Sequence, residues 1–142
     1  MTIGRMIRER TREVISCDAS LPLGEAVSLL AGQRIGALPV LDDGRVAGIF
    51  SERDVIHQLD ADGPAILERT VGEVMTAPAI TVTPETTVLE ALGLMTRRRI
   101  RHLPVVEGDR IVDFVSIGDL VKYRIDHIQT EAEALRSYIQ SA

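Results

Sequence analysis

The chain has 142 residues, which is enough for one compact core or for two small units that share a core, but not for two independent domains. Its two Phe, two Tyr and no Trp argue against a platform for single-stranded nucleic acid, because such a platform needs aromatic faces on which bases stack. The formal net charge of −5 argues against a protein that binds a phosphate backbone, although it is compatible with a local site for a small anionic ligand.

The only cysteine is Cys17, so no disulfide forms within the chain. Because the matching residue in the second half of the chain, Val82, falls in an apolar stretch, we expect a buried, inert thiol rather than a reactive one. The sequence contains no apolar run long enough for a membrane span and no apolar signal core at its start. We therefore expect a cytoplasmic protein without a membrane partner.

The first half of the chain is predicted to form a strand, a helix, a β-hairpin and a second helix. Apolar residues at helical spacing predict the first helix; they are Leu23, Ala26, Val27 and Leu30. Apolar runs at 38–41 and 46–50, on either side of Asp42-Asp43-Gly44, predict the hairpin. Ser51-x-x-Asp54 then opens a helix, and residues 60–64 (Asp-Ala-Asp-Gly-Pro) give the strongest loop signal in the chain.

The second half is predicted to repeat this order. It begins at residues 70–75, which echo residues 2–7 at a shift of 68, so a short capped turn is expected before each repeat. Residues 79–83 predict a short strand, and Thr87-x-x-Glu90 is the pattern of a capping box. Residues 103–106 and 111–115 predict strands joined by a turn at 107–110, and Ser116-x-x-Asp119 opens the last helix. The apolar stripe of the helix after the capping box consists of Val88, Ala91, Leu92 and Met95.

The two halves align in sequence at a shift of 65 residues. Gln33–Val40 falls on Arg98–Val105, and Ser51–Asp54 falls on Ser116–Asp119. A repeat of this kind predicts that each copy is one supersecondary unit that buries its apolar face against the other copy. We therefore expect an α+β fold of two β-α-β-β-α repeats with pseudo-twofold symmetry and a ligand cleft between them. The expected boundaries are 1–60 for the first repeat, 61–69 for a linker, 70–124 for the second repeat and 125–142 for a C-terminal helix extension.

The C-terminal segment has no counterpart in the first half. Its apolar residues recur at spacings of 4, 3, 4, 3 and 4, which predicts one straight stripe on a long helix; they are Val121, Ile125, Ile128, Ala132, Leu135 and Ile139. The stripe is short for a coiled coil. Two interpretations remain open: the helix packs on its own repeat, or it joins a second copy of the chain in a homodimer.

The Ser-x-x-Asp pattern after the last strand of each repeat is the first candidate binding motif. Ser51 and Ser116 are suitable helix N-caps, and the helix dipole favours Asp54 and Asp119, so a purely structural role explains the pattern. The same geometry suits a nucleotide, because helix amides attract phosphate and a carboxylate accepts hydrogen bonds from two ribose hydroxyls. The motif alone does not separate the two roles.

The second candidate is the basic stretch Arg97–His102, which occurs only in the second repeat. Guanidinium groups bind phosphate in a bidentate manner. The stretch therefore predicts an anion site, with Arg53 of the first Ser-x-x-Asp as a further donor; a solvated basic face is the alternative. The candidate donors of the stretch are Arg98, Arg99, Arg101 and His102.

Catalysis is poorly supported. His57, His102 and His127 are scattered and show no metal-ligand spacing. The chain has no glycine-rich phosphate fingerprint and no nucleophile elbow. We therefore expect a binding protein rather than an enzyme, with no catalytic residues, no metal and no catalytic cofactor.

These patterns resemble a known family. The resemblance rests on Ile-Gly-Ala-Leu-Pro-Val and Ile-Phe-Ser-Glu-Arg-Asp in the first repeat, and on Ile-Arg-His-Leu-Pro-Val and Val-Ser-Ile-Gly-Asp-Leu-Val-Lys in the second. The chain resembles a tandem cystathionine-β-synthase-type (CBS) domain pair, or Bateman module, of the stand-alone bacterial signalling type. The resemblance extends from about Thr2 to Lys122. It implies repeats packed through their sheets with two clefts between them. In such modules the clefts bind AMP, ADP or ATP, and sometimes NAD or S-adenosylmethionine.

The resemblance also implies residue roles. Asp54 and Asp119 would hold ribose, and Ser51 and Ser116 would approach phosphate. Backbone groups at 15–17 and 80–82 would frame adenine, and the residues just before each Leu-Pro would line the clefts. The expected ligand-binding residues are Ile15, Cys17, Ala37, Pro39, Ser51, Arg53 and Asp54 in the first repeat, and Ile80, Thr81, Val82, Arg101, His102, Pro104, Ser116, Ile117 and Asp119 in the second.

The cleft of the second repeat is the preferred site. Arg101 and His102 there would balance phosphate charge, where the first repeat has Gly36 and Ala37. One departure from the family pattern is that a glycine at position 48 is matched by Asp113, which changes the strand beside this site.

We therefore expect an adenine-nucleotide-binding regulatory module, with AMP as the first choice of ligand and ATP, ADP or NAD next. It is expected to form a homodimer, to signal to an unidentified protein partner, and not to bind nucleic acid. The alternative is a structural or protein-interaction dimer module with no physiological ligand.

Overall fold

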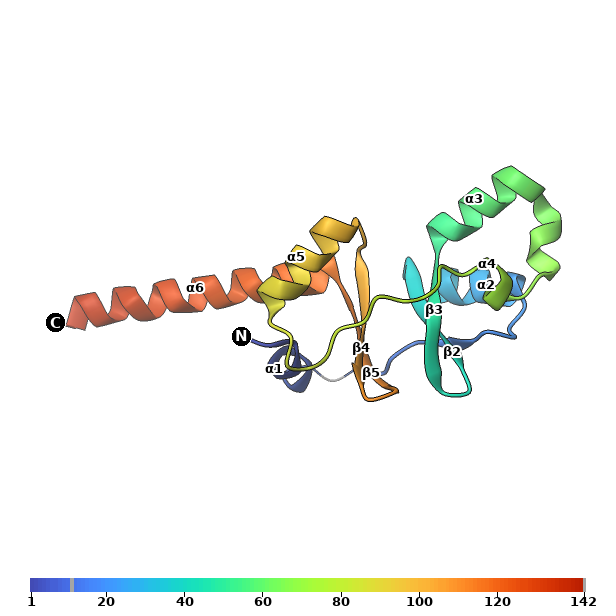
Figure 1. The fold of residues 1–142 in the computed structure, drawn as a ribbon. Coiled ribbons are helices and arrows are strands. Elements are labelled where there is room, and N and C mark those ends of the chain that lie inside the picture. The colour runs from blue at the N-terminus through green and yellow to red at the C-terminus, as the bar shows by residue number, and fades with distance from the viewer. Residues whose placement is uncertain (11, 142) are drawn as a thin grey trace.

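A β-α-β-β-α unit and an α-β-β-α unit, the second ending in a long C-terminal helix, make up the fold (Figure 1). The computed structural model describes residues 1–10 and 12–141; Thr11 and Ala142, which fall in the expected first repeat and C-terminal extension, lie outside the described residues. The first unit contains β1 (Cys17–Asp18), α2 (Leu23–Gln33), β2 (Ala37–Asp42), β3 (Arg45–Ser51) and α3 (Glu52–Asp62). The second contains α5 (Val88–Arg98), β4 (His102–Glu107), β5 (Arg110–Ser116) and α6 (Ile117–Ser141). The predicted α+β fold of two repeats is confirmed.

Local sequence explains where the helices and hairpins begin. The predicted capping box of α5 is present: the Glu90 N–H donates to Oγ1 of Thr87 at 3.0 Å, and the Thr87 N–H donates to the Glu90 carboxylate at 3.2 Å. Both hairpins turn at a glycine with a positive φ, 79° at Gly44 and 61° at Gly108, which glycine adopts without a steric penalty. The two glycines occupy different places in their turns, since at the shift of 65 Gly44 matches Asp109 and Gly108 matches Asp43.

Short helices that precede the repeats are exchanged between the two units. α1 (Ile3–Arg8) places Ile3 and Met6 in the core of the second unit, with α5 and the β4–β5 hairpin. α4 (Val71–Val74) likewise buries Val71 and Val74 in the core of the first unit. Because each core is completed by a helix that the other repeat's leading segment supplies, the two units are interlocked.

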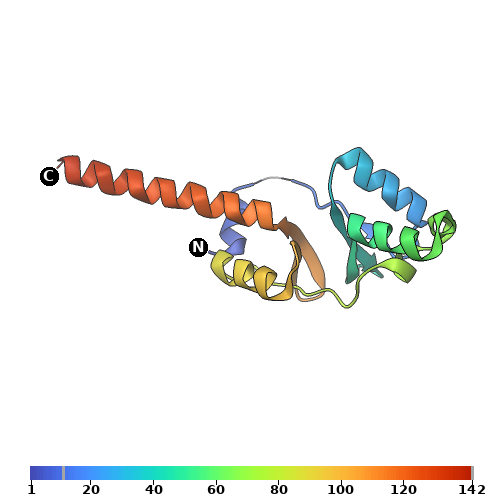
Figure 2. The ribbon, with the colours of Figure 1, turned by 90° about the horizontal axis from the view of Figure 1, so that it is seen from above.

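The two sheets lie next to each other at the centre of the molecule, and the helices lie on the outside (Figures 1 and 2). In the first sheet β1 is parallel to β2, and β2 is antiparallel to β3; β4 and β5 form an antiparallel pair. β3 contacts β5 across the boundary between the units. Each hairpin leads directly into a helix, α3 after β3 and α6 after β5, so these helix N-termini start at strand ends.

Three local predictions are wrong. Residues 79–83 do not form a strand: only Val82 pairs, through an isolated parallel bridge to Val105, because Pro78 and Pro84 bracket the stretch and lack the N–H that a ladder needs. The predicted loop at 60–64 is helical as far as Asp62, and the 3₁₀ helix η1 (Pro64–Glu68) follows after one residue. The turn at 70–75 lacks its expected side-chain cap, whereas the turn at 2–7 has one.

α6 packs on the second unit only over its first two turns. Leu120 is fully buried in the second core, and Tyr123 packs against that core. Beyond this point the helix projects away from the body (Figures 1 and 2), and its stripe residues Ile125, Ile128 and Leu135 are 48–59% exposed. The interpretation that this helix packs on its own repeat is therefore wrong for the segment beyond Tyr123.

Candidate functional site

A cleft of about 300 Å³ lies between the two units and is lined by both. The first unit contributes the segment before β1 and the turn before β2, with Arg12, Glu13, Val14, Ile15, Ile35, Gly36 and Ala37. The second unit contributes His102 from β4, Asp113, Phe114 and Ser116 from β5, and Asp119 from the first turn of α6. The sequence interpretation gave each cleft to one repeat; the structure instead combines the leading segment of the first repeat with the Ser-x-x-Asp of the second.

Asp119 is held in the cleft by the start of α6. The Ser116 N–H donates to Oδ2 of Asp119 at 2.8 Å, and the Asp119 N–H donates to Oγ of Ser116 at 3.0 Å, so the predicted capping role is present. Burial alone would raise the pKa of the Asp119 carboxyl, but the hydrogen bond from Ser116 and the charges of Arg12 and Arg10 outweigh burial and lower this pKa below its ordinary value. Asp119 is therefore an ionised acceptor at neutral pH.

Two arginines of the leading segment form an ion-pair network with two aspartates of the second unit. Arg10 Nη2 lies 2.9 Å from Oδ2 of Asp113, and Arg10 Nη1 lies 3.4 Å from Oδ2 of Asp119. Arg12 lies between the same acids, with Nη2 3.2 Å from Asp119 Oδ2 and Nε 3.7 Å from Asp113 Oδ1. Asp113 is only 4% exposed, and a carboxylate so buried needs such partners.

The matched position in the first unit shows why Gly48 and Asp113 differ. A Cβ at Gly48 would lie 2.7 Å from the Thr76 carbonyl oxygen, because the segment that leads into the second repeat passes directly over β3. Thr76 also donates from Oγ1 to Oδ1 of Asp54 at 3.0 Å, so this segment occupies the place beside the first Ser-x-x-Asp. In the second unit the side chain of Asp113 holds the equivalent crossing segment through Arg10 instead. The glycine-to-aspartate change therefore accompanies a chain crossing, and it does so beside the cleft, which Asp113 also lines.

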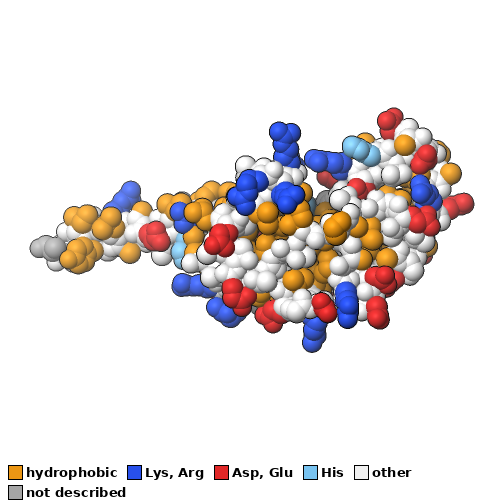
Figure 3. Space-filling view, viewed as in Figure 1, with side chains coloured by type: hydrophobic (Ala, Val, Ile, Leu, Met, Phe, Trp, Pro, Cys, Tyr) orange, Lys and Arg blue, Asp and Glu red, His pale blue; other side chains and the backbone are white. Residues whose placement is uncertain are grey.

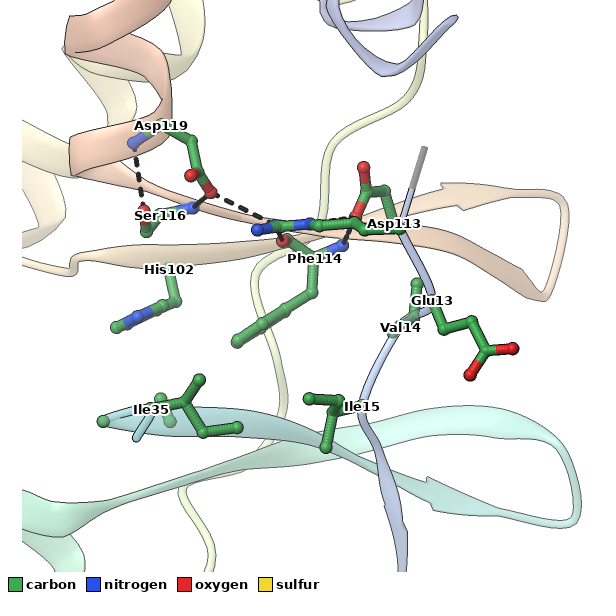
Figure 4. Close-up of a pocket in the computed structure, with 12 residues that line it drawn as sticks. Glu13, Val14, Ile15, Ile35, His102, Asp113, Phe114, Ser116 and Asp119 are labelled. Carbon is green, nitrogen blue, oxygen red and sulfur yellow. Dashed lines mark hydrogen bonds and ion pairs between the residues drawn. The ribbon is translucent and has the colours of Figure 1, made fainter. Parts of the chain in front are cut away.

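One wall of the cleft is aromatic. The rings of His102 and Phe114 are stacked, with centroids 5.3 Å apart and planes 8° from parallel. Figure 4 shows both rings on the side of the second unit, facing Ile35 and Ile15 of the first. Burial lowers the pKa of His102 below its ordinary value; the charge of Asp119 opposes this shift. The imidazole is therefore neutral at neutral pH and does not supply the positive charge expected from sequence.

Five of the expected ligand-binding residues meet in this cleft: Ile15, Ala37, His102, Ser116 and Asp119. The others do not line it. Ser51 and Asp54 form a second capping box at the N-terminus of α3. Cys17, Pro39, Val82 and Pro104 are buried, Ile80 is half-buried, and Arg53, Thr81, Arg101 and Ile117 are exposed. The expectation of a buried thiol is confirmed, since Cys17 is 8% exposed, and burial raises its pKa to about 11.

The sequence interpretation missed Arg10, Arg12 and Phe114. The two arginines lie where the first repeat carries three extra residues, so comparison of the repeats gave them no counterpart. Two signals were available. An aspartate in an apolar strand, Asp113, requires a cationic partner, and Phe114 is aromatic where the first repeat has Ile49.

Within the described part of the chain, no helix is both long and apolar enough to cross a membrane. Among the same residues, no group of three or more His, Cys, Asp or Glu side chains is arranged to hold a metal ion.

Comparison with known proteins gives concordant results. The mitochondrial CBS domain-containing protein CBSX3 of Arabidopsis thaliana is 38% identical over 129 residues; the match covers 87% of this chain and 63% of CBSX3, so the chain spans less than two thirds of that relative. The crystal structure of a CBS-domain containing protein from Agrobacterium tumefaciens is 34% identical, with a TM-score of 0.81 over 87% of this chain and 99% of that one.

A CBS domain pair solved in complex with 5′-methylthioadenosine and S-adenosyl-L-methionine has a TM-score of 0.77 over 89% of this chain and 98% of that one; at 22% identity this likeness shows the shared fold. The family model of the CBS domain matches twice, at residues 7–61 and 71–126, in agreement with the two units of the structure. The chain therefore belongs to the CBS domain family and carries two copies of that domain as an interlocked pair.

Proposed function

We propose that this regulatory CBS domain pair binds one adenine nucleotide, preferably AMP, in the cleft between its repeats and communicates occupancy to a protein partner. The observation that carries the proposal is that one cleft combines a flat apolar slot with an ionised carboxylate at a helix N-terminus. Because both repeats line this cleft, a bound ligand would contact both and would bias their relative position.

The slot suits a heteroaromatic base. Stacked His102 and Phe114 form one wall, and Ile35 and Ile15 form the other (Figure 4). Apolar and aromatic walls with few polar groups are typical of small-molecule sites. The volume of about 300 Å³ is at the lower end of the usual range for ligand pockets, which favours a mononucleotide over a dinucleotide such as NAD.

Asp119 is the expected ribose partner. Its hydrogen bonds and ion pairs within the described chain all fall on Oδ2, from the Ser116 N–H and from Arg12 and Arg10. The other carboxylate oxygen, Oδ1, is the acceptor for ribose hydroxyls in this proposal.

The charges of the cleft favour a ligand with one phosphate. Arg10 and Arg12 are balanced by Asp113 and Asp119, Glu13 adds a further negative charge, and His102 is neutral, so the cleft contains no excess of positive charge. Arg12 is the donor best placed for a single phosphate, because its side chain is 43% exposed while Arg10 is more buried. A triphosphate would add negative charge that nothing in the cleft compensates. The complex of the structurally similar CBS pair with two adenosine-containing ligands supports the adenosine class.

A thermal-shift screen of purified protein with AMP, ADP, ATP, NAD and S-adenosylmethionine tests the proposal. A ligand at a hundredfold excess over its Kd stabilises by about 2.7 kcal/mol, which corresponds to a rise in Tm of roughly 5–10 °C for a chain of this size. We expect the largest rise with AMP and a smaller one with ATP. A flat response across the panel would contradict ligand binding, and a larger response to ATP or NAD would contradict the preference inferred from charge and volume.

The projecting half of α6 favours a second function, that of a homodimeric interaction module. The two functions are compatible. A flat ligand screen together with an intact dimer would leave only the interaction role.

A further inference from the structure

The projecting half of α6 carries a continuous apolar stripe that nothing in the described chain covers. Ile125, Ile128, Leu135 and Ile139 are 48–64% exposed, and Val121, one turn before them, is 42% exposed; Figure 3 shows apolar side chains along the projecting helix. From Arg124 to Ser141 the helix extends roughly 27 Å beyond the core, at 1.5 Å per residue. We propose that this segment forms a parallel two-stranded coiled coil with α6 of a second copy of the chain.

The spacing of the stripe matches a heptad seam. The alternation of 4 and 3 places Ile125, Ala132 and Ile139 at the a positions, and Val121, Ile128 and Leu135 at the d positions. Ile125 and Ile139 at a with Leu135 at d follow the pattern that favours two strands, whereas Val121 and Ile128 at d depart from it. The f positions, which face away from such a seam, are Tyr123, Thr130 and Ser137, all of them hydroxyl-bearing.

The charges beside the seam select a second copy in parallel orientation. In a parallel pair, Glu131 at position g lies next to Arg136 at position e of the other copy, and symmetry forms this ion pair twice. In the antiparallel pair that overlaps the whole stripe, Glu131 faces Glu131 of the other copy and Lys122 faces Arg136. Within the described chain, neither Glu131 nor Arg136 makes an ion pair of its own. Like charges destabilise by about as much as opposite charges stabilise, so the parallel arrangement is preferred.

The seam is shorter than three heptads, so we expect a reversible dimer whose population depends on concentration. A parallel seam would place the two bodies, and hence the two clefts at the start of α6, at the same end of the assembly. This inference does not rest on the proposed ligand, because the seam begins after the turn that carries Asp119.

Disulfide trapping tests both the surface and its orientation. Cys17 is 8% exposed, so the native chain is a suitable background for single added cysteines. In a parallel pair, residue 135 of one copy lies opposite residue 135 of the other, so Leu135→Cys places two cysteines face to face. In the antiparallel pair, residue 135 lies opposite residue 125. The two added cysteines are then separated by ten residues along the helix, or roughly 15 Å, which is too far for a disulfide. We expect Leu135→Cys to form a covalent dimer under mild oxidation and the outward-facing control Ser137→Cys to form little.

Two results would overturn the proposal. One is a Leu135→Cys variant that crosslinks no better than Ser137→Cys; the other is a covalent dimer formed mainly in a mixture of Ile125→Cys and Leu135→Cys chains.

Light scattering provides a second measurement: the native chain should approach twice its 15.5 kDa mass as concentration rises. Glu131→Arg should weaken dimerisation about tenfold, and Glu131→Arg combined with Arg136→Glu should restore it. A native chain that stays monomeric, or a double variant no tighter than the single one, would contradict the seam.

Discussion

Replacing Gly48 by alanine inserts a methyl group where the segment between the repeats crosses β3. The added Cβ would lie 2.7 Å from the carbonyl oxygen of Thr76 and 2.8 Å from Sδ of Met75. The methionine side chain is able to move aside. The carbonyl is not, because Thr76 and Ile49 exchange two backbone hydrogen bonds of 3.0 and 2.9 Å. The segment must therefore shift as a whole and strain both bonds.

We expect Gly48→Ala to lower the free energy of unfolding by about 2–3 kcal/mol. Overpacking of a tight contact costs about 1–3 kcal/mol, and weakening two hydrogen bonds adds to this, since each contributes about 0.5–1.5 kcal/mol. The corresponding fall in Tm is roughly 6–10 °C. Urea denaturation, monitored by circular dichroism, measures the change directly.

Gly32→Ala is the matched control. Gly32 lies in α2, and a Cβ there would meet no atom within 4 Å. Alanine in an exposed helix is more favourable than glycine by about 0.5–1 kcal/mol, so this variant should be slightly more stable than the native chain. If Gly48→Ala and Gly32→Ala had the same effect, the crossing of the segment over β3 would not explain the glycine.

Three further predictions concern buried groups. Asp113→Ala should lower the free energy of unfolding by about 2 kcal/mol in urea denaturation, because Arg10 loses a buried partner while the half-exposed Arg12 remains hydrated; unchanged stability would contradict the ion-pair network. Cys17, with its pKa raised to about 11, should resist alkylation at neutral pH until the protein is unfolded in urea, and rapid labelling of the native chain would contradict its burial. Because the pKa of His102 is lowered in the folded protein, the unfolded chain binds the imidazole proton more tightly. The contribution of His102 to stability should therefore be full above the ordinary pKa of 6.5 and fall as pH decreases below that value. His102→Gln should flatten this part of the profile of stability against pH, and an unchanged slope would contradict the assignment.

The sequence was sufficient to predict the elements that depend on local chemistry. The Thr87–Glu90 capping box, the two glycine turns and the Ser116–Asp119 cap all follow from residues within four positions of each other, and the structure contains each of them. The repeat predicted two similar units for the same reason, because each copy must fold its own hairpin and helix.

The composition of the cleft could not be predicted, because it depends on contacts between distant segments. Arg10 meets Asp113 across 103 residues, and this contact exists only because α1 crosses to the second core. The repeat comparison paired Ile15 with the first Ser-x-x-Asp, whereas the exchange of leading segments places Ile15 with Asp119. Thr76 then occupies the place beside Asp54, so similar motifs in the two repeats have different surroundings.

The projecting half of α6 shows a second limit of prediction from one chain. Its stripe was evident from spacing, but spacing alone did not decide whether its own repeat or another molecule covers it. Leu120 is fully buried in the core of the second unit, and the residues after Tyr123 lie too far along the helix to contact that core. The exposed stripe is therefore a property of the fold rather than of the helix alone.

Calorimetric titration of AMP into the native chain, Asp119→Asn and Asp54→Asn is the most direct test of the proposed site. Asp54 and Asp119 each take part in a capping interaction with a serine at a helix N-terminus. Each variant therefore perturbs one such interaction, and comparing the two separates the effect on the helix cap from the loss of a contact with the ligand. We predict one AMP per native chain, affinity weakened about tenfold to a hundredfold by Asp119→Asn, and little change with Asp54→Asn, because a hydrogen bond to a charged group contributes about 1.5–3 kcal/mol. Equal losses in both variants, or a greater loss with Asp54→Asn, would contradict a nucleotide site at the cleft between the repeats.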